Sequence, residues 1–155
     1  MLPDRTSILR HCRALLEARA SEYTRELAGL DEAAAGETKS SAGDKYETAR
    51  EMIAQSRGIL ERNLSEARAG LDALTRMSAA PQGPRILFGT LAETSQGWHL
   101  LGASLGELEI DGNTIRLISL ASPLGAALKG KSAGDRVPWR GGDLEILRIA
   151  QPAAP

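Results

Sequence analysis

Hydrophobic residues recur with a seven-residue period along two long stretches in the N-terminal half of this chain. In the first stretch, each member of the repeat after the first has a second small or apolar residue four positions further along the chain. These positions are Leu9, Leu16, Tyr23 and Leu30, then Ala20, Leu27 and Ala34. A sustained seven-residue repeat of this kind is typical of the contact seam of a coiled coil. The pattern therefore predicts one long helix.

The same repeat resumes after a break. It runs through Tyr46, Ile53, Leu60, Ala67 and Leu74, and is widened by Ala49, Leu64 and Leu71. The break itself, ETKSSAGDKYETAR from Glu37 to Arg50, is poor in apolar residues, and Gly36 and Gly43 can adopt the backbone angles of a chain reversal. We expect residues 1–80 to form an antiparallel hairpin with its tip at residues 36–44, each helix having about 30 residues and a length of roughly 45 Å. An intermolecular coiled coil would share these heptads, so the oligomeric state stays open.

The pattern changes after residue 80. Pro81, Gly83 and Pro84 end the second helix and mark a linker at residues 81–85. Short alternating runs separated by Gly, Asp and Asn follow, and these predict a mostly antiparallel sheet in residues 86–150. The runs are ILFGTLAE, GWHLLGAS, GELEIDG, NTIRLISLA and GGDLEILRIA. SPLGAALKG has helical spacing and predicts one short helix, and residues 151–155 form a tail, so the predicted fold class is α+β.

Composition narrows the possible partners. With a net charge of -1 in 155 residues, the chain has no basic excess that would hold nucleic acid directly. Cys12 is the single cysteine and cannot form an internal disulfide, and the N-terminus has no long apolar run. We therefore expect a cytoplasmic protein with no membrane partner.

Local strings that suggest catalysis have simpler interpretations. GASLG, residues 102–106, matches the pattern around a nucleophilic serine, but it leads into an alternating strand, so Ser104 is expected in a turn. GKSAGD, residues 130–135, lacks the leading glycine and the Lys-Ser/Thr pair of a phosphate-binding loop and is expected to be a turn between strands. His11, Cys12 and His99 lack the spacing of a zinc site. We expect no catalytic site and no metal site of the chain's own.

Carboxylates gather around the predicted tip. Asp44 followed by Glu47 is the spacing of a helix capping box, in which the Asp side chain accepts from first-turn amides and the Glu side chain reaches back to the amide of the capping residue. Glu37 is explained as a solvated charge near a helix end. Capping explains these residues without any function, and a role for Glu37, Asp44 and Glu47 as functional tip residues is the alternative.

One segment carries a family resemblance. ASPLGAALKGKSAGDRV, residues 121–137, followed by a glycine turn and a last strand, resembles the C-terminal domain of the bacterial Gre transcript-cleavage factors. The matching residues are Ser122, Pro123, Ala127, Leu128, Gly130, Lys131, Gly134 and Asp135. ILFGT, residues 86–90, is similar to the first strand of that domain, and KYETARE, residues 45–51, is similar to the start of the family's second coiled-coil helix.

The resemblance implies an FKBP-like C-terminal domain that docks on RNA polymerase through the matching segment. It also implies a coiled coil that enters the secondary channel of the polymerase. There the family's tip carboxylates help to hold a Mg²⁺ ion shared with the polymerase, which then cleaves backtracked RNA by two-metal hydrolysis. The chain would thus assist the polymerase rather than be an enzyme itself, and it would meet nucleic acid only through the polymerase.

The chain departs from the family at the tip. Alignment through Tyr46 places the two acidic tip positions of the cleavage factors on Lys39 and Ala42, which cannot bind Mg²⁺ as carboxylates do. Three functions therefore remain open. The first is an elongation factor that stimulates cleavage or otherwise modulates the polymerase; the second is a Gre-like inhibitor or stress regulator without cleavage; the third is a coiled-coil interaction module unrelated to transcription.

Overall fold

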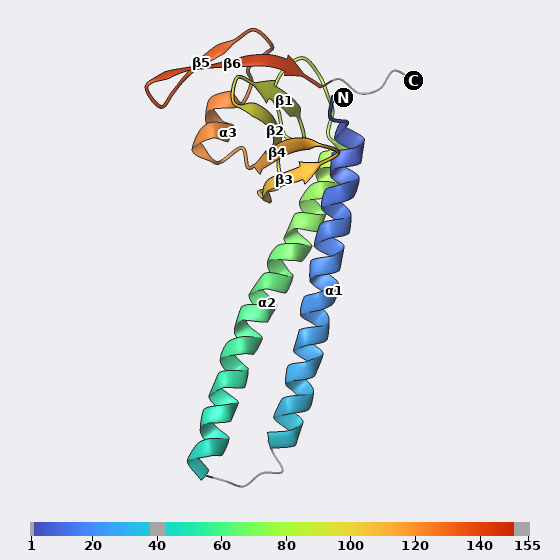
Figure 1. Cartoon of the computed structure of the whole chain (residues 1–155), viewed down its shortest axis with the longest axis vertical. Helices are drawn as coiled ribbons and strands as arrows, with labels where there is room; N and C mark the ends of the chain where they lie inside the picture. The colour runs from blue at the N-terminus through green and yellow to red at the C-terminus, as the bar shows by residue number, and fades with distance from the viewer. Residues whose placement is uncertain (1, 38–42, 151–155) are drawn as a thin grey trace. The chain divides into compact units, whose positions relative to one another are not determined.

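The structure is a computed structural model that describes residues 2–37 and 43–150. Two long helices are followed by six strands and a short helix (Figure 1). In chain order the elements are α1 (Arg5–Glu37), α2 (Gly43–Ala79), β1 (Leu91–Thr94), β2 (Gly97–Leu101), β3 (Gly106–Ile110), β4 (Asn113–Ile118), α3 (Pro123–Leu128), β5 (Arg136–Trp139) and β6 (Gly142–Ile149). The predicted α+β class, with two long helices and one short helix, is confirmed.

The chain divides into two compact units. The sheet unit comprises Met1–Arg13 and Asp72–Pro155, and the hairpin unit comprises Ala14–Leu71. The start of α1 and the end of α2 therefore belong to the sheet unit, together with all six strands.

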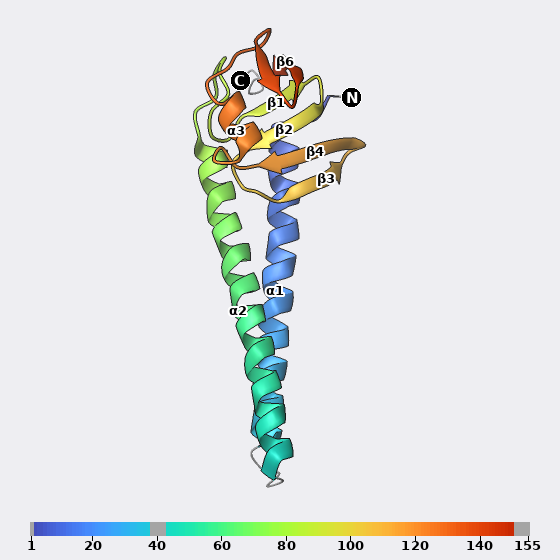
Figure 2. The same cartoon turned by 90° about the vertical axis from the view of Figure 1, so that its left-hand side faces the viewer.

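The two long helices pack against each other through the predicted seam. Of the seam residues whose side chains the structure describes, all are buried or half-buried, whereas their neighbours on the outer faces are exposed. In the sheet unit Arg13 donates a hydrogen bond to the Thr75 hydroxyl at 2.7 Å. In the hairpin unit Arg57 forms an ion pair with Asp31. In each unit the contact joins α1 to α2, and the two helices run in opposite directions (Figure 2).

The six strands form one mixed sheet in the order β3-β4-β2-β1-β6-β5. Four of the five strand pairings are antiparallel, in agreement with the predicted mostly antiparallel sheet, and the β2–β4 pairing is parallel, which was not predicted. Asp111 and Gly112, between β3 and β4, have φ angles of 50° and 80°. Two successive positive φ angles make the type I′ turn that an Asp-Gly pair favours in a hairpin.

The sheet is covered on both faces. On one face Ala92, Leu101 and Ile146 belong to a buried core that includes Leu128 of α3. Side chains alternate along a strand, so Leu91 and Leu100, which are also fully buried, lie on the opposite face. The last turn of α2 reaches the loop after β2, where the Ala103 amide donates to the Met77 sulfur at 3.3 Å. Figure 1 shows α3 on one side of the sheet and the start of α1 on the other.

Two elements differ from the sequence prediction. Residues 86–90, which were predicted to be a strand, contain a turn instead, and the isolated bridge just before them joins Arg85 to Ser132. The Ile86 amide donates to the Lys131 carbonyl, and the Ile86 carbonyl accepts from the Gly130 amide. The Thr90 amide donates to the Leu87 carbonyl and closes the turn. Conversely, β5 was not predicted, because Pro138 lacks a backbone donor and interrupts the alternating pattern. Its position at the sheet edge is where a proline is tolerated.

Candidate functional site

The predicted hairpin tip is bounded by the end of α1 at Glu37 and the start of α2 at Gly43. Lys39 and Ala42 lie outside the residues that the structure describes. Asp44 and Glu47 fall at the beginning of α2, and Glu47 is exposed. The capping role and the metal-holding role of Glu37, Asp44 and Glu47 both stay predictions.

The first turns of α2 carry two shallow hollows. One, of about 310 Å³, is lined by Glu47, Arg50, Glu51 and Ala54. The other, of about 330 Å³, is lined by Lys45, Thr48, Ala49 and Met52. Met52 is 63% exposed although it is apolar. This end of α2 thus presents charges of both signs beside an exposed apolar side chain, a mixture that suits contact with another macromolecule.

The first half of the segment at residues 121–137 builds α3. The Ser122 side chain caps the helix by accepting from the Gly125 amide at 3.0 Å, and it donates to the Ser119 carbonyl at 2.6 Å. Pro123 occupies the first helical turn, where its missing amide hydrogen costs nothing. Leu128 is fully buried in the core, and Ala127 is half-buried. These four residues of the segment therefore have structural roles.

The second half forms the connection from α3 to β5, so the predicted turn between strands is a turn between a helix and a strand. Gly130 has a φ of +79° and donates its amide to the Ile86 carbonyl at 2.7 Å. The Asp135 carboxylate accepts from the Ser132 amide at 2.8 Å, and the Gly134 amide donates to the Ile146 carbonyl at 2.7 Å. Lys131 is exposed. The hydrogen bonds and backbone angles of this turn account for Gly130, Gly134 and Asp135. The exposed side chain of Lys131 is accessible to a partner.

The other candidates from the sequence have no catalytic surroundings. Ser104 is exposed in the loop between β2 and β3. Within the described parts of the chain no three His, Cys, Asp or Glu side chains are grouped as a metal site would require. None of the helices described combines the length and apolar composition that a bilayer crossing needs.

Cys12 and His99 are both fully buried. Burial raises the pKa of the Cys12 thiol to about 11, so the unreactive thiol form prevails near neutral pH. His99 lies in β2, as predicted, and its Nε2 atom has no hydrogen-bond partner. Burial, and secondarily the positive charge of Arg116, lowers the pKa of His99. Neither residue is placed to act on a substrate from solvent.

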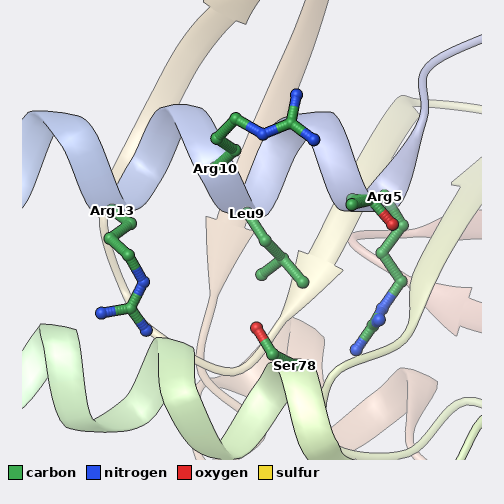
Figure 3. Close-up of a pocket in the computed structure, with 6 residues that line it drawn as sticks. Arg5, Leu9, Arg10, Arg13 and Ser78 are labelled. Atoms are coloured by element: carbon green, nitrogen blue, oxygen red, sulfur yellow. The ribbon is translucent and has the colours of Figure 1, made fainter.

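Sequence reasoning missed a pocket in the sheet unit. It has a volume of about 320 Å³ and is lined by Arg5, Thr6, Leu9, Arg10, Arg13 and Ser78. Arg5 and Arg13 extend from α1 toward α2 on either side of Leu9, and the Ser78 hydroxyl faces Leu9 between them (Figure 3). A signal was present in the sequence, since RTSILRHCR, residues 5–13, contains three arginines and no acidic residue.

Comparison with known proteins gives no assignment: no protein-family model, no curated protein sequence and no solved structure matches the chain.

Proposed function

We propose that this chain is a Gre-like transcription factor that binds RNA polymerase and places its hairpin tip in the secondary channel of the enzyme. From there it would modulate the polymerase or stimulate cleavage of backtracked RNA. It would act in the cytoplasm and assist the polymerase active site rather than carry a catalytic site of its own.

The observation that carries this proposal is the order and type of the elements. Two long helices packed in antiparallel register precede a mixed sheet with one short helix, which is compatible in general form with a coiled coil and an FKBP-like domain. A second support is local. The segment from Ser122 to Asp135 that resembles the family forms one continuous unit, α3 and its connection to β5.

The chemistry proposed for the hairpin tip is recruitment of a metal ion. In two-metal phosphodiester hydrolysis a weakly held Mg²⁺ ion orients the attacking water, and an added carboxylate strengthens its binding. Glu47 is exposed and acidic, and Asp44 and Glu37 are close to it in sequence. These are the carboxylates that would contribute to the Mg²⁺ ion shared with the polymerase.

A second candidate function is a Gre-like regulator that occupies the channel without promoting cleavage. Lys39 and Ala42, at the positions where the resemblance expects acids, favour it. A lysine would repel a divalent cation rather than hold it. Such a protein would inhibit the polymerase or modulate it during stress.

Copurification tests binding to RNA polymerase, which both proposed functions require. A tagged copy of the whole chain should retain the polymerase subunits at physiological salt, and Lys131→Glu should weaken this retention if the exposed face of the α3–β5 connection docks. Arg68→Glu, which makes the same charge change at an exposed position of α2 outside both proposed contact surfaces, is the comparison. Absence of the polymerase from every preparation would leave only an interaction module unrelated to transcription.

A cleavage assay on backtracked complexes then separates the two functions. RNA shortening that is lost in Glu47→Ala and kept in Glu66→Ala would identify the cleavage factor, provided that circular dichroism shows the helices intact. If the wild-type chain gives no shortening, the double change Lys39→Asp with Ala42→Glu should create it, because both acidic positions would then be restored. Failure of that variant, when it still binds the polymerase, would argue against the tip alignment.

A further inference from the structure

The pocket between the start of α1 and the end of α2 has a cationic rim and an apolar floor. Leu9 is buried and forms the floor, whereas Thr6, Arg10 and Ser78 are exposed. Arg5 and Arg13 flank Leu9, and Arg10 lies along α1 above it (Figure 3). A volume of about 320 Å³ is at the small end of the range for small-molecule sites.

Arg5 is held in place by the backbone of the sheet unit. Its Nε atom donates to the Gly89 carbonyl at 2.6 Å, and its Nη2 atom donates to the Met77 carbonyl. Gly89 has a φ of +89°, and an added Cβ there would lie 3.1 Å from Arg5 Nη2. Partial burial lowers the pKa of Arg5, but a guanidinium stays protonated near neutral pH. A fixed positive charge therefore borders the pocket, with its Nη1 group not engaged by these two bonds.

Arg13 is also positioned by the protein, because it donates to the Thr75 hydroxyl across the two helices. The Ser78 hydroxyl donates to the Leu74 carbonyl at 3.0 Å. Arg10 is exposed and can turn toward a ligand without breaking either contact. Two anchored guanidinium groups and one exposed guanidinium group thus line the same pocket.

Arg5 lies in the first turn of α1, where a positive charge is unfavourable for the stability of the helix. The N-terminal end of a helix carries a partial positive charge, and cations near it are unfavourable. The first turn of α1 contains no acidic residue. Asp4, just before it, accepts from the Ser7 amide at 3.1 Å and does not line the pocket. A bound anion would offset this repulsion through the side chains, without needing the first-turn amides.

We propose that this pocket binds the phosphoryl or pyrophosphoryl group of a small molecule, with the carbon skeleton of the ligand against Leu9. A phosphoryl group presents three acceptor oxygens and up to two charges, so it can bridge several separated guanidinium and hydroxyl donors at once. A carboxylate has two oxygens in one plane and matches a single guanidinium. The site is independent of polymerase binding.

Calorimetric titration of the whole chain with pyrophosphate and with inorganic phosphate, at constant ionic strength in chloride, tests the proposal. We expect saturable binding, and amide shifts in NMR spectra centred on Thr6, Arg10 and Ser78. Arg10→Gln should weaken the affinity for pyrophosphate about tenfold, because it removes one charge-assisted hydrogen bond to a phosphoryl oxygen. Arg68→Gln, an equal loss of charge on an exposed part of α2, should leave it unchanged.

A second pair of variants separates charge from shape. Ser78→Glu places a carboxylate in the pocket and should abolish pyrophosphate binding. Ser78→Gln introduces a neutral side chain of the same size as glutamate and should reduce pyrophosphate binding less. Position 78 is exposed on α2, so both proteins should fold. Absence of saturable binding would overturn the proposal, as would equal losses in Arg10→Gln and Arg68→Gln. A poly-glutamate peptide that shifts the same amides when pyrophosphate does not would also overturn it and identify an acidic protein partner.

Discussion

Gly125 lies where the backbone of α3 approaches the preceding loop most closely. A Cβ atom added at this position would lie 2.0 Å from the Ser119 carbonyl oxygen and 2.9 Å from Leu120 Cα. Both are backbone atoms, so neither can turn aside as a flexible side chain would. The sequence pattern around SPLG indicates a helix start, but this close approach is visible only in the structure.

We expect Gly125→Ala to destabilise the protein by about 3 kcal/mol, the upper end of the cost of overpacking. Urea unfolding followed by circular dichroism measures the change in free energy. Ala126→Gly, at the exposed next position, should cost only about 1 kcal/mol through helix propensity. Equal losses in the two variants would show that α3 can move away from Ser119.

His99 predicts a pH dependence of stability. Its folded pKa is lowered from 6.5, first by burial and then by Arg116, so the native state favours the neutral ring. Between the lowered pKa and about 6.5 the unfolded chain binds a proton that the native chain does not. The free energy of unfolding should therefore fall as the pH drops below about 6.5 and be constant just above it.

Urea titrations between pH 7.5 and about 5 test this expectation. His99→Leu should remove most of the slope, because no group at position 99 then titrates. His11→Gln should retain it, since His11 is exposed. A slope that survives in His99→Leu and disappears in His11→Gln would contradict this expectation, because the pH dependence would then come from His11.

At the scale of elements, heptad periodicity predicted α1 and α2 well. The seam is set by local spacing, and the described residues of the seam are the covered ones. The strand content was harder to predict, because the bonding of residues 86–90 depends on Gly130 and Lys131, far along the chain. The arginine pocket was missed for the same reason, since Ser78 joins Arg5 and Arg13 only when the helices pair.

The surroundings of position 58 in α2 give no structural reason for a glycine there. An added Cβ there would meet nothing within 4 Å, and its φ angle is not positive. Gly58→Ala should stabilise the protein by about 1 kcal/mol, the difference in helix propensity. Ala54→Gly, one turn earlier at an exposed position, should destabilise it by a similar amount. Thermal and urea unfolding of both variants measure this, and a loss of stability in Gly58→Ala would contradict the open environment.

At the scale of the whole molecule, the proposed function depends on two separate surfaces. The exposed side chains around α3 and its connection to β5 would dock on the polymerase, and the start of α2 would lie near the catalytic metal. At 1.5 Å per residue, helices of 33 and 37 residues are roughly 50 and 55 Å long. Such helices bury little of their own surface, and a partner channel would cover what remains exposed.

Site-specific crosslinking from the start of α2 tests the central claim most directly. Cys12 is buried and has a raised pKa, so a cysteine introduced as Lys45→Cys is the one that a maleimide photocrosslinker will label. In complexes with RNA polymerase we expect crosslinks from position 45 to the inner end of the secondary channel, beside the catalytic Mg²⁺ ion. Arg140→Cys, in the β5–β6 turn, should crosslink only to the outer rim. Crosslinks from position 45 to the outer surface of the polymerase, or the absence of any complex, would contradict the claim.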